Sequence, residues 1–255
     1  MVSTRKITGV LKNLTINMTE KTIGDPIGKA ILTYAEDRRP ADIIVKSDIC
    51  DDDIIPLEVL FRKFDEMPEL EQVALEESRG KVLDVGAGAG AHAKYLKELE
   101  LDVECIDVSK GAIEYLTDMD FSARQVDFFD LKDEKYDTVL MLMNGIGIAG
   151  TLKNLENTLE QAKSLLSPGG QILCDSSDIK YLYEDEDGSM VIDLNSEYYG
   201  NFRFQMKFKN EVGAWFDWLY VDFDNLFKAA KNVGLKASKI YDKDDHFLAQ
   251  ITLED

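Results

Sequence analysis

Val82-Leu83-Asp84-Val85-Gly86-Ala87-Gly88-Ala89-Gly90-Ala91 is the stretch that decides the fold of this chain. The apolar residues up to Val85 predict a buried strand, and the residues after Gly90 predict the start of a helix. The three alternating glycines allow a sharp turn and leave no Cβ atoms to hold a ligand away from the backbone. This strand–turn–helix pattern is typical of nucleotide-binding α/β proteins.

Asp84 separates two classes of ligand for this turn. Gly86, Gly88 and Ala91 fit the loose dinucleotide pattern G-x-G-x-x-G/A, and a dinucleotide places its pyrophosphate at such a turn. A carboxylate two residues before the first glycine would repel that pyrophosphate. S-adenosylmethionine has no phosphate, and its α-ammonium and sulfonium both favour a nearby carboxylate. The loop therefore favours S-adenosylmethionine.

Two further acids stand at the ends of predicted strands. Asp107 follows the apolar run 101–106, where a carboxylate can accept hydrogen bonds from both hydroxyls of a ribose. NAD is recognised in the same way, so Asp107 alone does not discriminate. Asp127 follows a strand over 123–126 and can accept from an adenine amino group, while an aromatic ring of Phe128 or Phe129 flanks the purine.

Five strand–helix units alternate along this part of the chain. A fourth buried strand covers 135–143 and ends at Asn144-Gly145, and a helix over 152–166 stops at a Ser-Pro-Gly-Gly sequence. A fifth strand over 171–174 ends at Asp175. The alternation predicts a parallel sheet with its ligand at the carboxyl ends of the strands.

Five segments then occur in a familiar order: Val-Leu-Asp-Val-Gly-Ala-Gly-Ala-Gly (82–90), Ile-Asp-Val-Ser (106–109), Val-Asp-Phe-Phe-Asp-Leu (126–131), Tyr-Asp-Thr-Val-Leu (136–140) and Leu-Leu-Ser-Pro-Gly-Gly (165–170). With them, residues 80–175 resemble a class I S-adenosylmethionine-dependent methyltransferase. The flanks at 61–68 and 175–178 resemble a bacterial branch of that family whose substrates are uncharacterised.

The resemblance implies an α/β fold with a doubly wound, mostly parallel seven-stranded Rossmann-like sheet whose final strand is antiparallel. It also implies S-adenosylmethionine as methyl donor and S-adenosylhomocysteine as product. The expected cofactor-binding residues are Asp84, Gly86, Ala87, Gly88, Asp107, Val108, Asp127, Phe128, Met143, Asn144 and Arg62.

We expect residues 1–80 to form an N-terminal arm and a helical cap across the ligand site, not a separate domain. The predicted elements are an arm over 1–17, helices over 27–36, 56–64 and 70–78, and a solvated turn over 51–53. Phe61, Arg62 and Phe64 are candidates to close over the cofactor, with Arg62 pairing with its carboxylate. The alternative is an amphipathic helix with both phenylalanines in the core and Arg62 solvated.

Residues 81–255 are expected to form the methyltransferase domain, with an antiparallel insertion over 175–220. Strands are predicted over 190–194, 202–208 and 212–219, followed by a helix over 222–233 and closing strands over 236–241 and 246–253. The insertion holds 11 of the 24 aromatic residues of the chain. These aromatics either wall an apolar pocket over the methyl group, as a lid that sets substrate specificity, or cover the inner face of a small sheet.

Methyl transfer requires in-line alignment of a nucleophile with the S–CH₃ bond and exclusion of water. A hydroxyl or amine acceptor would also need a base, for which Asp175, Asp178 and His246 are candidates. His92 is expected to lie beside the cofactor or to pack, not to act as base. Asn144-Gly145 lacks the prolines of the Asn-Pro-Pro-aromatic motif of nucleic-acid amino methylation. No His/Cys pair has ligand spacing, so no metal is predicted.

The composition and net charge of the chain restrict the classes of partner that we expect it to bind. A net charge of −20 repels nucleic-acid phosphates and anionic membranes, and no apolar run is long enough to span a bilayer. Three widely spaced cysteines indicate buried free thiols and a cytoplasmic protein. We expect methyl transfer to a small molecule, for which the aromatic insertion favours an aromatic or apolar body, with protein methylation still open. An NAD-dependent oxidoreductase and a non-catalytic S-adenosylmethionine-binding regulatory protein are the alternatives. The acceptor and the oligomeric state are not encoded in any motif.

Overall fold

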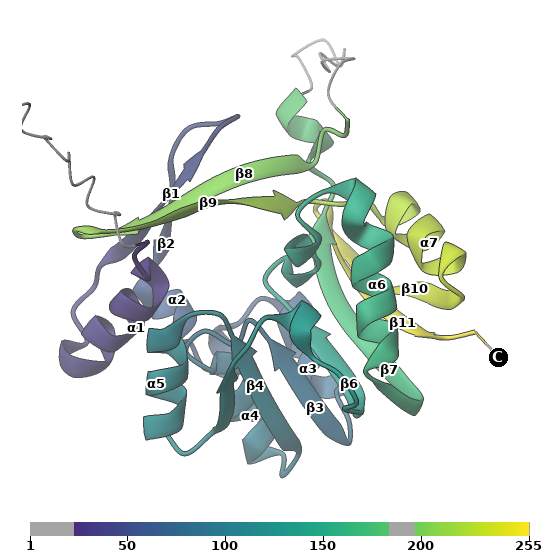
Figure 1. Ribbon diagram of the computed structural model, residues 1–255, viewed down its shortest axis with the longest axis horizontal. Coiled ribbons are helices and arrows are strands. Elements are labelled where there is room, and N and C mark those ends of the chain that lie inside the picture. The colour runs from purple at the N-terminus through teal and green to yellow at the C-terminus, as the bar shows by residue number, and fades with distance from the viewer. Residues whose placement is uncertain (1–22, 184–196, 255) are drawn as a thin grey trace, which may run out of the picture.

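The computed structural model of the protein describes residues 23–183 and 197–254. It contains a seven-stranded sheet and a four-stranded sheet, and the smaller sheet lies above the upper end of the larger one (Figure 1). The expected arm over 1–17 and the expected strand over 190–194 fall outside the described residues.

The seven-stranded sheet has the order β10-β11-β7-β6-β3-β4-β5. Its strands are β3 (Lys81–Val85), β4 (Asp102–Asp107), β5 (Ser122–Gln125), β6 (Tyr136–Met141), β7 (Leu166–Ser177), β10 (Leu235–Lys243) and β11 (His246–Leu253). Five neighbouring strands, β7, β6, β3, β4 and β5, are parallel to one another. Strand β11 pairs antiparallel with both β7 and β10. The predicted fold class, including the antiparallel final strand, is confirmed.

Helices cover both faces of this sheet. They are α3 (Glu69–Glu77), α4 (Ala91–Glu98), α5 (Lys110–Asp118), α6 (Leu155–Ser164) and α7 (Phe223–Asn232). Leu75, Leu96 and Leu116 bury α3, α4 and α5 in one apolar cluster, whereas Leu159 and Leu226 bury α6 and α7 in another. Figure 1 shows α6 and α7 together beside β7. The carboxyl ends of the parallel strands are left uncovered by these helices, as a ligand site requires.

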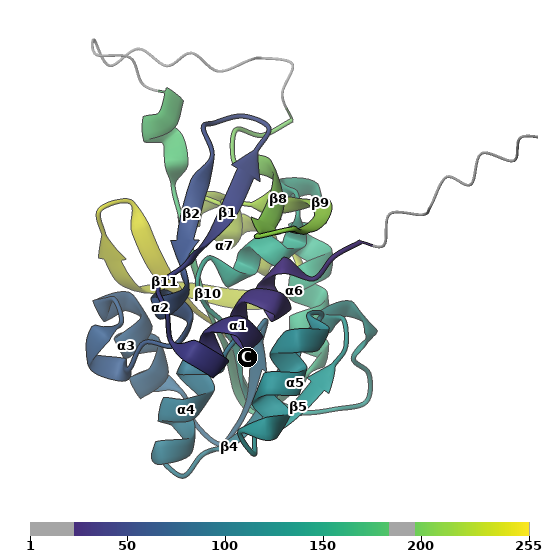
Figure 2. The same ribbon diagram turned by 90° about the vertical axis from the view of Figure 1, so that its left-hand side faces the viewer.

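The four-stranded sheet, which we call the roof sheet, has the order β2-β1-β8-β9. It joins β1 (Asp42–Ser47) and β2 (Asp53–Pro56) to β8 (Asn201–Phe208) and β9 (Glu211–Leu219). Val45 pairs with Met206 across the β1–β8 ladder. Figure 2 shows β1 and β2 rising as a hairpin beside β8 and β9. The N-terminal region thus contains the expected helices, but it also supplies half of a sheet that the sequence analysis did not predict.

The N-terminal helices are α1 (Pro26–Asp37) and α2 (Leu57–Leu60). The second is shorter than the predicted helix over 56–64, because the chain leaves the helix at Phe61 and re-enters a short 3₁₀ turn at Phe64–Glu66. The other 3₁₀ turns are Phe128–Asp130, Gly145–Ala149, Leu152–Asn154 and Ile179–Tyr183.

Helix α1 is fixed directly to the residues that follow β4. Asp25 caps α1 by accepting from the N–H of Gly28, and its other oxygen accepts from Ser109 Oγ at 2.9 Å and from the N–H of Gly111 at 3.0 Å. A Cβ at Gly28 would lie 2.7 Å from the backbone of Gly111, so the two helices cross at a contact that only glycine allows. One acid thus caps α1 and ties it to the loop after β4.

Candidate functional site

The glycine turn after β3 has the conformation that its sequence predicts. Gly86, Gly88 and Gly90 have φ angles of 72°, 55° and 75°, in the left-handed region that favours glycine. A Cβ atom at Gly86 or Gly88 would meet no atom within 4 Å among the described residues. The turn is therefore open above its backbone, and Ala87 lines the same space.

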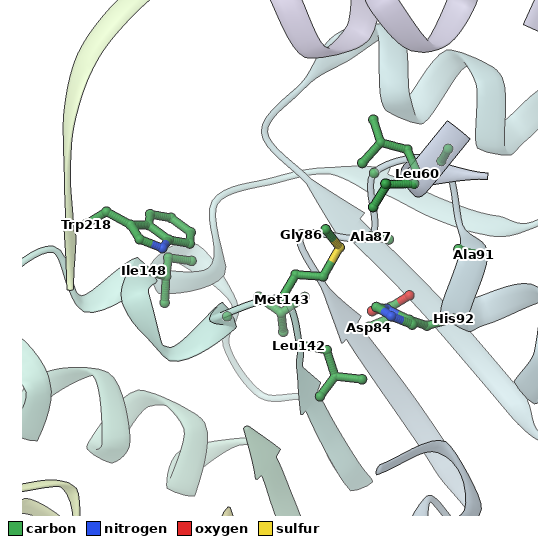
Figure 3. A pocket seen from close by; sticks show the side chains of 15 residues that line it. Leu60, Asp84, Gly86, Ala87, Ala91, His92, Leu142, Met143, Ile148 and Trp218 are labelled. Atoms are coloured by element: carbon green, nitrogen blue, oxygen red, sulfur yellow. The ribbon is translucent and has the colours of Figure 1, made fainter. Parts of the chain in front are cut away.

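Asp84 lies at the bottom of this space with one unused carboxylate oxygen. Its exposed fraction is 2%, and Oδ2 has no hydrogen-bond partner in the described part of the chain. Burial raises the pKa of Asp84 to about 6. The residue borders a cavity of about 160 Å³, whose far side is formed by Met143, Ile148 and Trp218 (Figure 3). We call this the small cavity; a buried acid facing it is suited to a cationic ligand.

His92 borders the small cavity beside Asp84 (Figure 3). Its Nε2 lies 2.7 Å from Oε2 of Glu71, and the guanidinium of Arg62 donates to the same carboxylate. Burial acts to raise the pKa of Glu71, but the hydrogen bonds and charges of His92 and Arg62 outweigh it, so the pKa is lowered. These three buried side chains form a charged cluster directly behind the small cavity.

Arg62 is consequently neither solvated nor lining the space above the glycines. Only 9% of the residue is exposed, and its guanidinium also donates to the carbonyl of Val59. Of its aromatic neighbours in sequence, Phe61 packs against Tyr34 and Tyr115, and Phe64 stacks on Tyr95. The alternative prediction, that both phenylalanines pack inside the protein, is confirmed. Its prediction that Arg62 is solvated is wrong.

Asp107 lies at the carboxyl end of β4 and faces a second, larger cavity. Its Oδ2 accepts from the N–H of Gly88 at 2.9 Å, and its Oδ1 accepts from the N–H of Ser109 at 2.8 Å. Burial raises its pKa even though these hydrogen bonds act in the opposite direction. The next residue, Val108, leaves 67% of its surface exposed toward the same cavity.

Asp127 and the two phenylalanines after it border the larger cavity further along the sheet edge. The carboxylate of Asp127 is exposed and accepts from the N–H of Phe129 at 2.9 Å. Phe128 is buried in the core with 2% exposed, whereas Phe129 is 41% exposed. The freely accessible ring is therefore that of Phe129.

Met143 and Asn144 both have positive φ angles, of 62° and 57°, where the chain turns after β6. Met143 borders both cavities. The side chain of Asn144 is occupied inside the protein, because its Nδ2 donates to the carbonyl of Leu219 and its Oδ1 accepts from Ser176 Oγ. Asn144 thus ties β6, β7 and the end of β9 together.

The three candidate bases lie outside both cavities. Asp175 accepts from the N–H groups of Asn144 and Gly145, and burial raises its pKa to about 6. Asp178 accepts from Tyr199 Oη and from Lys180. His246 is exposed, and its Nδ1 lies 2.6 Å from Ser177 Oγ. The structure therefore gives Asp175 a part in shaping the Met143–Asn144 turn, whereas Asp178 and His246 are bonded to other side chains outside the cavities.

The larger cavity, of about 800 Å³, extends from Asp107 to the roof sheet. Six side chains of the β8–β9 pair and the residue after it line its roof: Phe202, Phe204, Met206, Phe216, Trp218 and Tyr220. The β1–β2 hairpin adds Val45, Ile55 and the turn residues Cys50, Asp51 and Asp53. This hairpin was not predicted, because only the short β-branched run over 43–45 could have indicated a strand.

The chain is similar to a known protein family and to solved structures. A family model described as a methyltransferase domain matches residues 58–219. A crystal structure of an S-adenosylmethionine-dependent methyltransferase from Bacteroides fragilis, in complex with S-adenosyl-L-homocysteine, is 42% identical to this chain. The match covers 91% of this chain and 95% of that one, with a TM-score of 0.85.

More distant structures share the fold. The CcbJ methyltransferase from Streptomyces caelestis is 15% identical over 75% of this chain and 95% of its own, with a TM-score of 0.56. A DhpI–SAM–HEP complex is 21% identical over 77% of this chain and 95% of its own, with a TM-score of 0.53. A comparison with curated proteins found no match. Within residues 23–183 and 197–254, every helix is too short or too polar to cross a bilayer.

Proposed function

Because this chain belongs to the S-adenosylmethionine-dependent methyltransferase family, we propose that it transfers the sulfonium methyl group to a small-molecule acceptor by in-line attack. The observation that carries the proposal is the buried Asp84 carboxylate, with an unpartnered oxygen, under an open glycine turn. An α-ammonium group of the cofactor would supply the missing partner and offset the cost of burying the charge.

The remainder of the cofactor would follow the sheet edge into the larger cavity. Asp107 would accept from the ribose hydroxyls with the oxygen lone pairs that Gly88 and Ser109 leave free. Val108 would pack on the adenine, and Asp127 would accept from its amino group. Phe129 would contribute the accessible ring, while Phe128 supports it from the core.

The glycines Gly86 and Gly88, together with Ala87 and Met143, would contact the methionine part of the cofactor. Asn144 would act through its backbone, because its side chain is already bonded within the protein. Arg62 would act indirectly, by holding Glu71 against His92 beside this end of the site.

The acceptor would enter under the roof sheet. Trp218, Met143 and Ile148 border both cavities, so the transferable methyl would lie among them, at the junction. In this arrangement the domain over 81–255 would bind the cofactor, and the β8–β9 pair of the insertion would form a substrate lid together with the β1–β2 hairpin. Catalysis would rest on alignment and exclusion of water, with no side-chain base at the reacting atom. The acidic surface and the buried Cys105 and Cys174 support a cytoplasmic location.

Calorimetric titration with S-adenosylmethionine, S-adenosylhomocysteine and NAD tests the proposal. We expect micromolar binding of the first two ligands and none of NAD. Binding of NAD alone would favour an oxidoreductase. If methyl-labelled cofactor binds but no acceptor from a broad panel ever carries the label, a regulatory S-adenosylmethionine-binding protein is the better description.

A further inference from the structure

The part of the larger cavity beneath the roof sheet, which we call the acceptor chamber, has a consistent chemical character. Its roof is formed by the six β8–β9 side chains given above, four of which are aromatic residues from the strands themselves. Among the described residues that line the larger cavity there is no lysine, arginine or histidine. The chamber is continuous with the glycine turn through Val85 and Gly86, which border both cavities.

The roof sheet does contain cations, but they lie on its other face. Lys46 alternates with Val45 and Ser47 on β1, and Arg203 and Lys207 alternate with Phe202, Phe204 and Met206 on β8. Arg203 pairs there with Asp217 at 3.2 Å, so this acid, although it borders the cavity, has its carboxylate engaged. The face toward the cavity thus carries aromatic side chains without cations, whereas the other face carries the cations together with Trp215, over whose ring Arg203 lies.

Two acids close the chamber at the turn of the β1–β2 hairpin. Asp51, in the turn, and Asp53, the first residue of β2, both line the cavity beside Cys50, and both are exposed. Tyr220, in the roof, lines the same cavity: burial raises its pKa, and the charges of Tyr181 and Asp53 act in the same direction. An anionic acceptor would therefore meet aromatic faces and negative charge with no compensating cation.

We propose, as an extension of the function proposed above, that the acceptor is an amine on an aromatic or apolar body, methylated on nitrogen. Its protonated form would be attracted by Asp51 and Asp53 and by the π faces of Trp218 and Phe216. Its apolar body would fill the chamber between the roof sheet and Ile148.

The reaction balances without a further reactant. The ammonium first loses a proton to water, and the nitrogen lone pair of the neutral amine attacks the methyl carbon. The N–C bond forms while the S–C bond breaks, and the S–C electron pair neutralises the sulfonium to give S-adenosylhomocysteine. The methylated product keeps the positive charge as an ammonium, so the one proton released overall is the one that the substrate loses in the first step. The rate should therefore rise with pH as the neutral amine fraction grows.

The test uses the full-length protein saturated with S-adenosylhomocysteine. 2-Phenylethylamine, 2-phenylethanol and 3-phenylpropionate, which differ in their terminal group, are titrated separately by calorimetry. We expect the amine to bind about 3- to 30-fold more tightly than the alcohol, and the carboxylate to bind most weakly. In a parallel assay with methyl-labelled S-adenosylmethionine, the label should appear on the amine nitrogen.

Variants connect this preference to the hairpin acids. Asp51→Asn with Asp53→Asn should weaken amine binding about two- to five-fold and leave alcohol binding unchanged. Asp52→Asn is the matched control, because Asp52 is an exposed acid of the same turn that does not line the cavity. Asp53→Lys should move the preference toward the carboxylate.

Equal or tighter binding of the alcohol or the carboxylate overturns this inference, and so does failure of all three compounds to bind. The S-adenosylhomocysteine titration of the same sample separates the two proposals. If S-adenosylhomocysteine binds but the order of the probes is wrong, only the amine assignment fails. If S-adenosylhomocysteine does not bind, the proposed function itself is wrong.

Discussion

The glycine-turn side of the site is formed by segments that are close in sequence, whereas its roof is formed by segments that are far apart. The turn, Asp84, Asp107 and Asp127 come from the consecutive strands β3, β4 and β5 and the residues that directly follow them. The roof sheet joins a hairpin near the N-terminus to strands far along the chain, through the pairing of β1 with β8. Local sequence determines the first wall, whereas the second depends on a long-range strand pairing. Cofactor binding and acceptor choice should therefore respond to different substitutions.

The largest effect on stability is expected at Glu71, in the charged cluster behind the small cavity. Glu71→Ala leaves the buried guanidinium of Arg62 without its carboxylate, which should lower the free energy of unfolding by about 3–5 kcal/mol. Chemical denaturation measures this loss. Glu76→Ala, at an exposed acid of the same helix, is the control and should change stability by less than about 0.5 kcal/mol. Equal effects would show that the cluster does not stabilise this wall.

Asp107→Ala should act on the cofactor specifically. Loss of its charge-assisted hydrogen bonds to the ribose should weaken S-adenosylhomocysteine binding by about 1–3 kcal/mol, or roughly 5- to 150-fold. Calorimetry of the variant gives this number directly. Asp217→Ala, which removes an acid of the roof sheet that is paired with Arg203, serves as the comparison. Unchanged affinity in Asp107→Ala would mean that the ribose lies elsewhere.

The protonation state of Asp84 should make both the stability of the protein and its affinity for the cofactor depend on pH. Its pKa of about 6 lies above the ordinary aspartate value, so it contributes stability below pH ~4 that is lost as the pH rises through 6. Asp84→Asn should therefore stabilise the ligand-free protein by about 1–2 kcal/mol at pH 7.5. Thermal unfolding at pH 5 and pH 7.5 measures this gain.

The same substitution should weaken S-adenosylhomocysteine binding at pH 7.5, because the ammonium loses its counterion. In the unsubstituted protein the affinity should fall as the pH drops below 6, and Asp84→Asn should flatten that dependence. Asp175 also has a raised pKa, so the stability of the variant will still vary with pH. A binding profile of the same shape in both proteins would exclude Asp84 as the ammonium partner.

The smallest effect on the cofactor should come from the roof. Phe204→Ala removes a ring that lines only the larger cavity, and S-adenosylhomocysteine affinity should change less than about two-fold. Combined with Asp107→Ala, its effect should be additive, as for independent sites. Trp218→Ala provides the contrast, because Trp218 borders both cavities and should couple to the cofactor. Strong coupling of Phe204 would show that the two walls act as one.

Prediction from the sequence succeeded where a residue's surroundings are set by its neighbours along the chain. The glycine turn and the three acids each lie at or just after the carboxyl end of a parallel strand, and the sequence around each strand identifies it. The antiparallel β10–β11 pair was predicted from the resemblance to the methyltransferase family, and it is confirmed.

The same approach failed where a partner lies far away in sequence. The strand at 42–47 has no strong periodicity, and it is a strand because β8 supplies its hydrogen bonds. Arg62 is buried because Glu71, on another helix, neutralises it. Asp175 resembles a free acid in the sequence, yet the turn at Asn144 and Gly145 occupies both of its oxygens. Each error concerns a segment or a side chain whose environment is created by tertiary contacts.

The shared ladder between β1 and β8 also has a consequence for biosynthesis. Ribosomes release the N-terminal hairpin first, and its β1 edge has no β8 partner until residues 201–208 have been made. At ordinary elongation rates of about 5–20 residues per second, that interval is roughly 10–30 s. Throughout it, an apolar edge containing Ile43, Ile44 and Val45 is available to other chains. Nascent protein should therefore depend on chaperones more than its mature stability suggests.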